Sequence, residues 1–224
     1  MKIKNLIPLF FLIHFAGPAI CQQTSELVKS IGAQLAKNET TVSKVLSDPS
    51  YLSIHSLTSF REVIEQNAKP GRIKLNSGNE PGTGITVKGI VTDKPGKPLA
   101  DKLVYVYQTS SEGWYSDTAP HILQREGDRR HARLFGYFKT DPNGKFEFNT
   151  VKPKGYPNST LPAHIHIEIY LDEDKSFISE LQFDDDPRLT GDIRKRSVKE
   201  KYLVVKNSGT DNDPLYFYTI QVPD

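Results

Sequence analysis

The chain has 224 residues, enough for one ordinary domain with an extension or for two small domains. Hydrophobic residues make up 37% and charged residues 25%, as in ordinary globular proteins. The formal net charge is only +2 and basic residues cluster only briefly, at 194–196, which argues against a nucleic-acid partner.

Residues 1–21 are typical of a secretory signal peptide. The basic start MKIKN precedes the apolar segment LIPLFFLIHFAGPAI, and Ala19 and Cys21 are small residues at the −3 and −1 positions before Gln22. The apolar segment is short and broken for a bilayer span, so no membrane partner is expected. Cleavage would remove two lysines and the only cysteine. The secreted or periplasmic chain would then have no net formal charge and no disulfide.

Residues 22–75 are expected to form a helical N-terminal region. Apolar residues recur at helical spacing in 25–38, where Ser25 is suited to cap the helix, and again in 56–69. The sequence SDPS between these segments indicates a turn, so together they predict a helical hairpin. Its expected role is packing, or the pairing of two copies into a homodimer.

Residues 76–84 are typical of a linker, and the pattern changes to period two in the domain expected at 85–224. Many short alternating segments separated by turn signals predict a mainly β fold, an antiparallel β-sandwich. The stretch 110–133 is too long for a simple connection, and long loops on β scaffolds often carry functional residues. The predicted strands are 85–93, 102–110, 134–141, 145–151, 163–171, 177–183, 202–207 and 215–222.

The predicted strand 163–171 carries two histidines two residues apart. His164, His166 and Glu168 share one face of an extended chain, and the isoleucines between them line the other face. Two imidazoles at this spacing can bind one metal ion. A His-x-His pair alone is more typical of the polar face of a half-exposed sheet, and Glu168 is expected to be solvated.

Two tyrosines are candidates to complete a metal site. Tyr156 lies in the turn before the histidine strand, and Tyr115 begins the long loop after strand 102–110. Phenolate is a hard anionic donor that suits Fe(III), and a bound cation favours loss of the phenol proton. Two tyrosinates and two neutral imidazoles would leave the ferric site with one net positive charge and an open position.

At these residues the sequence resembles the intradiol ring-cleavage dioxygenases, which open catechols between the two hydroxyls with non-haem Fe(III). With its signal peptide, the chain would be a secreted member of that family. The resemblance covers roughly residues 87–189. It rests on four motifs in order. The family's first strand pair, which ends in Gly-x-Tyr, is matched by GIVTDKPGKPLADKLVYVYQTSSEGWY, and its hairpin before Pro-x-x-Tyr-Pro is matched by GYFKTDPNGKFEFNTVKPKGYP. Its Pro-Ala-His-Ile-His signature is matched by PAHIHIEI, and its closing strand and turn are matched by ELQFDDDP.

The resemblance implies a β-sandwich that binds one Fe(III) through Tyr115, Tyr156, His164 and His166. It implies a small catechol-like aromatic and O2 as substrates, and a muconate-type diacid as product. It also implies that the catechol binds as a dianion and displaces Tyr156, which accepts a proton as it leaves.

Two positions depart from the family pattern. Leu161 stands where the family usually has an arginine, three residues before the first histidine, and Glu180 stands where it usually has a glutamine. Arg129, Arg130 or Arg133 of the long loop could supply the missing positive charge, and a solvated basic loop is the alternative.

A non-catalytic binding module is the alternative function. Segments 89–106 and 136–153 also resemble transthyretin-like accessory domains, which share the glycine turns. Such modules have no reason to carry both tyrosines and both histidines. Colour would separate the two functions, because charge transfer from tyrosinate to Fe(III) makes a protein wine-red and a binding module is colourless.

Overall fold

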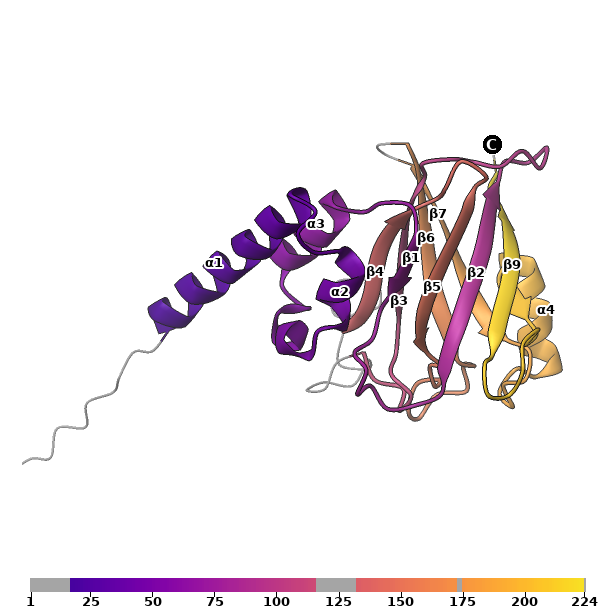
Figure 1. The fold of residues 1–224 in the computed structure, drawn as a ribbon. Coiled ribbons are helices and arrows are strands. Elements are labelled where there is room, and N and C mark those ends of the chain that lie inside the picture. The colour runs from indigo at the N-terminus through magenta and orange to yellow at the C-terminus, as the bar shows by residue number, and fades with distance from the viewer. Residues whose placement is uncertain (1–16, 116–131, 173–174, 224) are drawn as a thin grey trace, which may run out of the picture.

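The computed structural model describes residues 17–115, 132–172 and 175–223 (Figure 1). Two stacked β-sheets form the body of the protein. The N-terminal helices lie beside the β4 edge of the sandwich, and helix α4 lies on the opposite flank, near β9 (Figure 1). The sandwich predicted from the alternating segments is confirmed, and each of those eight segments contains a strand.

The two sheets are mixed rather than antiparallel throughout. Their strand orders are β1-β5-β2-β9 and β4-β3-β6-β7-β8, and the pairs β1·β5, β2·β9 and β7·β8 are parallel. Parallel neighbours need a crossover connection, and helix α4 (Gly191–Glu200) provides it between β7 and β8. The strands are β1 Arg72–Lys74, β2 Gly84–Thr92, β3 Leu103–Gln108, β4 Leu134–Lys139, β5 Lys145–Val151, β6 His164–Asp172, β7 Lys175–Phe183, β8 Leu203–Val205 and β9 Leu215–Gln221.

The N-terminal region is helical, with more elements than a simple hairpin. Ser25 lies inside the first helix and does not cap it, because that helix begins at Gly17. The SDPS turn opens a 3-10 helix in which the Asp48 carboxylate accepts a hydrogen bond from the Ser50 amide (2.9 Å). The helices are α1 Gly17–Ala36, α2 Val42–Ser47, the 3-10 helix η1 Pro49–Ile54, and α3 Thr58–Gln66.

Residues 72–74, within the region expected to be helical, form strand β1 and join the four-stranded sheet beside β5. A strand of three residues is too short to show an alternating pattern in the sequence. Among the described helices, none is long and apolar enough to cross a membrane.

A buried arginine fixes helix α3 to the five-stranded sheet. Arg61 is 2% exposed, and its guanidinium donates to the carbonyl oxygens of His55 and Ala132 (both 2.9 Å) and to the Tyr105 hydroxyl (2.6 Å). It also lies 3.6 Å from the ring centre of Phe135 in β4. The helical region therefore packs as part of the sandwich, as the packing role predicts.

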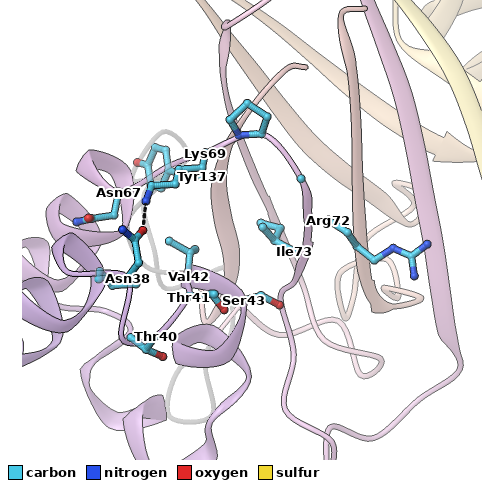
Figure 2. Close-up of a pocket in the computed structure, with 13 residues that line it drawn as sticks. Asn38, Thr40, Thr41, Val42, Ser43, Asn67, Lys69, Arg72, Ile73 and Tyr137 are labelled. Carbon is cyan, nitrogen blue, oxygen red and sulfur yellow. Dashed lines mark hydrogen bonds between the residues drawn. The ribbon is translucent and has the colours of Figure 1, made fainter. Parts of the chain in front are cut away.

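A cavity of about 280 Å³ lies between the N-terminal helices and strand β1 (Figure 2). Leu35, Val42, Ile73 and Tyr137 contribute to its lining, and none of the candidate metal ligands does. The tyrosines and histidines singled out by the sequence therefore belong to a different place in the molecule.

Candidate metal centre

Strand β6 places both histidines on the outer face of the five-stranded sheet. Ile165, Ile167 and Ile169 point into the core between the sheets and are at most 1% exposed. His164 and His166 point the opposite way, as the alternation along the strand predicts. The core packing of the isoleucines therefore fixes the direction of the imidazoles.

Glu168, on the same face, is buried rather than solvated as the sequence suggested. It is 5% exposed, and its carboxylate accepts a hydrogen bond from the Ser176 hydroxyl (2.7 Å). The strand register places it between Tyr105 of β3 and Ile178 of β7. Its hydrogen-bond partner Ser176 lies on β7, a contact that a pattern within one strand does not reveal.

A tight turn after β3 places Tyr115 beside the Tyr156 segment. The Ser110 amide donates to the Trp114 carbonyl (2.8 Å), and Gly113 has a φ of +88°. A side chain at Gly113 would be strained in this conformation, and its Cβ would lie 2.7 Å from the carbonyl oxygen of Gly155. The glycine therefore allows the two tyrosine-bearing segments to touch.

The four candidate side chains converge on one point. The Tyr115 and Tyr156 oxygens lie 2.6 Å apart, and the Nε2 atoms of His164 and His166 lie 3.1 Å apart. The Tyr156 oxygen is 3.0 Å from His164 Nε2 and 3.4 Å from His166 Nε2, and the Tyr115 oxygen is 2.9 Å from His166 Nε2. Metal–ligand bonds of about 2.1 Å place the ligand atoms of a tetrahedral site about 3.4 Å apart, so most of these atoms lie somewhat closer together than a bound ion would hold them, and small outward movements of the side chains would admit one ion.

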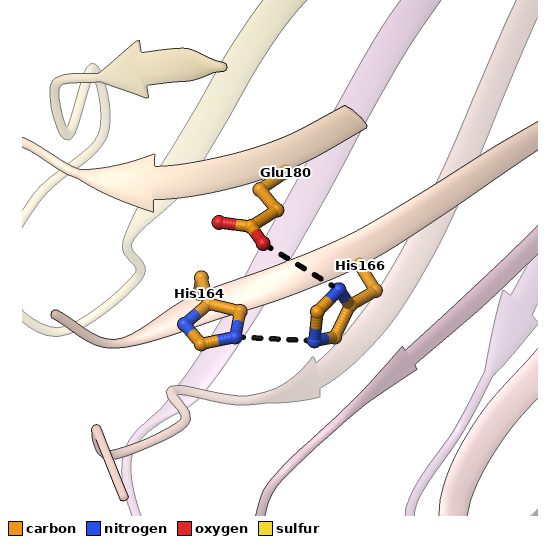
Figure 3. A group of neighbouring side chains, drawn as sticks. All are labelled: His164, His166 and Glu180. Atoms are coloured by element: carbon orange, nitrogen blue, oxygen red, sulfur yellow. Dashed lines mark hydrogen bonds and ion pairs between the residues drawn. The ribbon is translucent and has the colours of Figure 1, made fainter. Parts of the chain in front are cut away.

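Each histidine presents Nε2 to this point because a partner faces its other nitrogen. Nδ1 of His164 lies 2.8 Å from the carbonyl oxygen of Pro162, to which it donates. Nδ1 of His166 faces the Glu180 carboxylate at 3.8 Å (Figure 3), and the Tyr107 ring stacks on His166 at 4.4 Å. A hydrogen held on Nδ1 leaves the Nε2 lone pair available to a metal.

The two tyrosines lie in an environment that is largely closed to water. Tyr115 is 5% and Tyr156 is 7% exposed, and Ala132 and Leu161 pack against them. Burial, and then the nearby Tyr156 oxygen, raise the pKa of Tyr115 far above its ordinary value. A bound cation would offset that cost, and two phenol oxygens with two imidazoles are a donor set that fits a hard trivalent metal.

His164, His166 and Glu180 also form a cluster whose ligand atoms lie within 4.8 Å of one another (Figure 3). Two histidines and a carboxylate can bind iron(II) in other folds. Here the carboxylate faces Nδ1 of His166, whereas both tyrosine oxygens and His164 face Nε2. Glu180 therefore lies behind His166, on the side away from the two tyrosine oxygens.

The described residues show what two arginines near the candidate site bind. Arg133 is occupied by Glu80, to which its guanidinium donates through both terminal nitrogens, while Arg129 and Arg130 fall outside the described residues. Arg188, which the sequence did not single out, donates to the carbonyl oxygens of Tyr156 (3.1 Å) and Leu161 (3.4 Å). Arg188 thus ties together the two ends of the segment after Tyr156.

This arrangement defines a β-sandwich protein in which the donor atoms of two tyrosines and two histidines converge on one point. The family model described as Dioxygenase matches residues 59–221. The chain therefore belongs to the intradiol dioxygenase family, as its motifs predict.

Curated relatives of the chain include catechol and protocatechuate dioxygenases. Catechol 1,2-dioxygenase 1 of Acinetobacter lwoffii is 27% identical over 138 residues, which cover 54% of this chain and 42% of the relative. The protocatechuate 3,4-dioxygenase beta chain of Burkholderia cepacia is 31% identical over 126 residues, covering 53% and 52%. The chain thus spans about half the length of these relatives.

Solved structures share the fold. The 3-chlorocatechol 1,2-dioxygenase of Rhodococcus opacus 1CP aligns with a TM-score of 0.53 at 17% identity, over 93% of this chain and 100% of that one. An intradiol ring-cleavage dioxygenase from Tetranychus urticae aligns with a TM-score of 0.52 at 20% identity, over 67% and 85%. At these identities the likeness concerns the fold alone.

Proposed function

We propose that this chain cleaves catechol-type aromatic rings between the two hydroxyl-bearing carbons, using O2 and Fe(III), and releases muconate-type diacids. The convergence of the Tyr115, Tyr156, His164 and His166 donor atoms within 2.6–3.4 Å carries the proposal. Family membership supports the reaction class, and the catechol dioxygenases among the relatives support the substrate class.

Those four side chains would hold the iron. When bound, Fe(III) would serve as a template and Lewis acid that makes a catechol ring reactive toward O2. Leu161 and Ala132, packed on the tyrosine pair, would keep bulk water away from the ligand oxygens. Dry surroundings strengthen the electrostatic interactions on which the reaction depends.

Tyr156 is the residue we assign as proton acceptor. Its oxygen contacts the donor atoms of Tyr115, His164 and His166, so it occupies the middle of the cluster. A tyrosinate freed at this position is a strong base and could take the proton of an incoming catechol hydroxyl. Arg188 holds the main chain of Tyr156, which would keep the side chain within reach after it moves.

A non-catalytic module remains the competing function, and metal loading separates the two. We expect one iron per chain, a visible tyrosinate band, and O2 uptake with catechol. Tyr115→Phe should weaken or shift the band, and His164→Ala should lower iron content at least about tenfold, because each removes a ligand. Tyr218→Phe is the matched control, since Tyr218 lies on β9 in the other sheet.

Two results would contradict the proposed function. Full iron content and colour in His164→Ala would show that the metal binds elsewhere. A wild-type protein that stays colourless after loading and consumes no O2 with any of a panel of catechols would favour the binding module.

We also propose that the chain is exported and forms a homodimer through its N-terminal helices. Helix α1 begins at Gly17, so cleavage before Gln22 would remove its first turn and keep the rest. Leu27 on this helix is 37% exposed and available to a second copy. Mass spectrometry of protein from the native host should find Gln22 at the N-terminus, and sedimentation should find twice the chain mass.

A further inference from the structure

The nitrogen of His166 that points away from the metal centre faces a carboxylate. Nδ1 of His166 and Oε1 of Glu180 lie 3.8 Å apart (Figure 3), a separation that is too long for a hydrogen bond but short for charges shielded from water. The two residues are direct partners across β6 and β7. Their side chains are 18% and 19% exposed, so water screens the interaction only partly.

A buried polar chain holds Glu180 from behind. Its Oε2 accepts a hydrogen bond from Gln182 Nε2 (3.2 Å), and Gln182 Oε1 accepts one from the Ser197 hydroxyl of helix α4 (2.6 Å). Gln182 is 3% and Ser197 is 1% exposed. Buried polar groups tend to keep such partners because water cannot replace them. Helix α4 therefore fixes the position of the carboxylate.

The two histidines have different partners at Nδ1. His164 faces the neutral carbonyl of Pro162, whereas His166 faces the carboxylate of Glu180. At 3.8 Å the carboxylate acts on His166 through its charge: a negative charge beside Nδ1 favours the tautomer with the hydrogen on Nδ1 and makes the imidazole a stronger electron donor than a neutral neighbour would. The intradiol dioxygenases usually have glutamine at position 180, so Glu180 adds one negative charge beside the candidate metal centre of this chain.

We propose that Glu180 is a positioning residue that keeps the hydrogen of His166 on Nδ1 and increases electron donation from His166 to a bound ferric ion. The proposal rests on the proposed function, since it requires iron among the tyrosines and histidines. A more electron-rich site binds Fe(III) more tightly and makes it harder to reduce. It also moves the tyrosinate charge-transfer band to shorter wavelength, because transfer of an electron to the metal becomes more costly.

The test substitutes Glu180→Gln in the full iron-loaded chain, which preserves shape and removes the charge. Fe(III) affinity, measured by competition with a chelator, should fall about tenfold, within the range of outer ligand partners. The visible band should move to longer wavelength, and the iron should become easier to reduce in a redox titration. Ser197→Ala, which frees Gln182, should change each quantity in the same direction and by less.

Glu168→Gln is the matched control, because Glu168 lies on the same strand and face but bonds to Ser176. Equal shifts in Glu168→Gln and Glu180→Gln would overturn the proposal, because the loss of one negative charge anywhere near the site would then explain them without the contact between Glu180 and His166. Unchanged affinity and band in Glu180→Gln, with a red wild-type protein, would overturn this inference alone. A colourless, iron-free wild type would overturn the proposed function and this inference with it. If Glu180→Gln does not fold, Glu180→Asp should give the same shifts at smaller size, and no shift there would overturn the proposal.

Discussion

Removal of the Arg61 guanidinium should destabilise the protein strongly and loosen the metal centre. Arg61→Met fills much of the volume but leaves three buried acceptors, on His55, Ala132 and Tyr105, without their donor. Each unsatisfied buried acceptor costs about 1–3 kcal/mol, and with partial relaxation we expect a loss of about 3–5 kcal/mol in the free energy of unfolding. For a chain of this size that corresponds to about 10 °C in the melting temperature.

Urea denaturation of wild type and variant measures this loss. Arg61→Lys is the matched control, because it keeps the charge and one donor direction and should recover part of the stability. Iron affinity of Arg61→Met should also fall, since Ala132, released from Arg61, packs against Tyr115 and Tyr156. Replacement of a buried charge by an apolar side chain is sometimes neutral. A loss below about 1 kcal/mol in the free energy of unfolding of Arg61→Met would refute the view that the acceptors left without a donor determine its stability.

Two further predictions concern pH and catalysis. Burial lowers the pKa of His55 from 6.5 to about 4, so the unfolded chain takes up a proton first as the pH falls. The associated stability, about 3 kcal/mol, is therefore complete above pH 6.5 and is lost between pH 6.5 and 4. His55→Gln should flatten this dependence in denaturation curves, and an equally steep curve would assign it to other groups. Leu161→Arg should raise catechol turnover about tenfold or more with unchanged iron content, because a guanidinium beside the ligands would stabilise charge developing on the substrate. Leu161→Met is its control, and unchanged turnover in Leu161→Arg would contradict the view that the missing guanidinium limits the reaction.

Much of the fold and the candidate site could be predicted from local sequence. Alternating segments predict strands because side chains of an extended chain point alternately to opposite faces, and each predicted segment contains one. The same rule separates the isoleucines of β6 from His164 and His166, because apolar burial decides which face turns inward. Tyr115 and Tyr156 could be singled out because their motifs lie in order around that strand.

Elements without a periodic signal became visible only in the tertiary structure. Strand β1 has three residues, and helix α4 has few apolar ones, with Val198 left 78% exposed. Both elements are defined by what they pack against: β1 by β5, and α4 by the polar chain through Gln182. β5 lies far from β1 in the sequence, whereas Gln182 lies on β7, the element just before α4, and is brought to the helix by the turn between them.

Contacts between distant residues likewise depended on strand register and packing. The sequence suggested a solvated Glu168, and it marked Glu180 only as a departure from the family's usual glutamine. The pairing of β6 with its neighbours buries Glu168, and the pairing of β6 with β7 places Glu180 behind His166. The meeting of Arg61 with Ala132 depends on how helix α3 docks on the sheet. The sequence determined which side chains could serve the site, and the register and docking of its elements decided which partners orient them, since those contacts join residues on different elements.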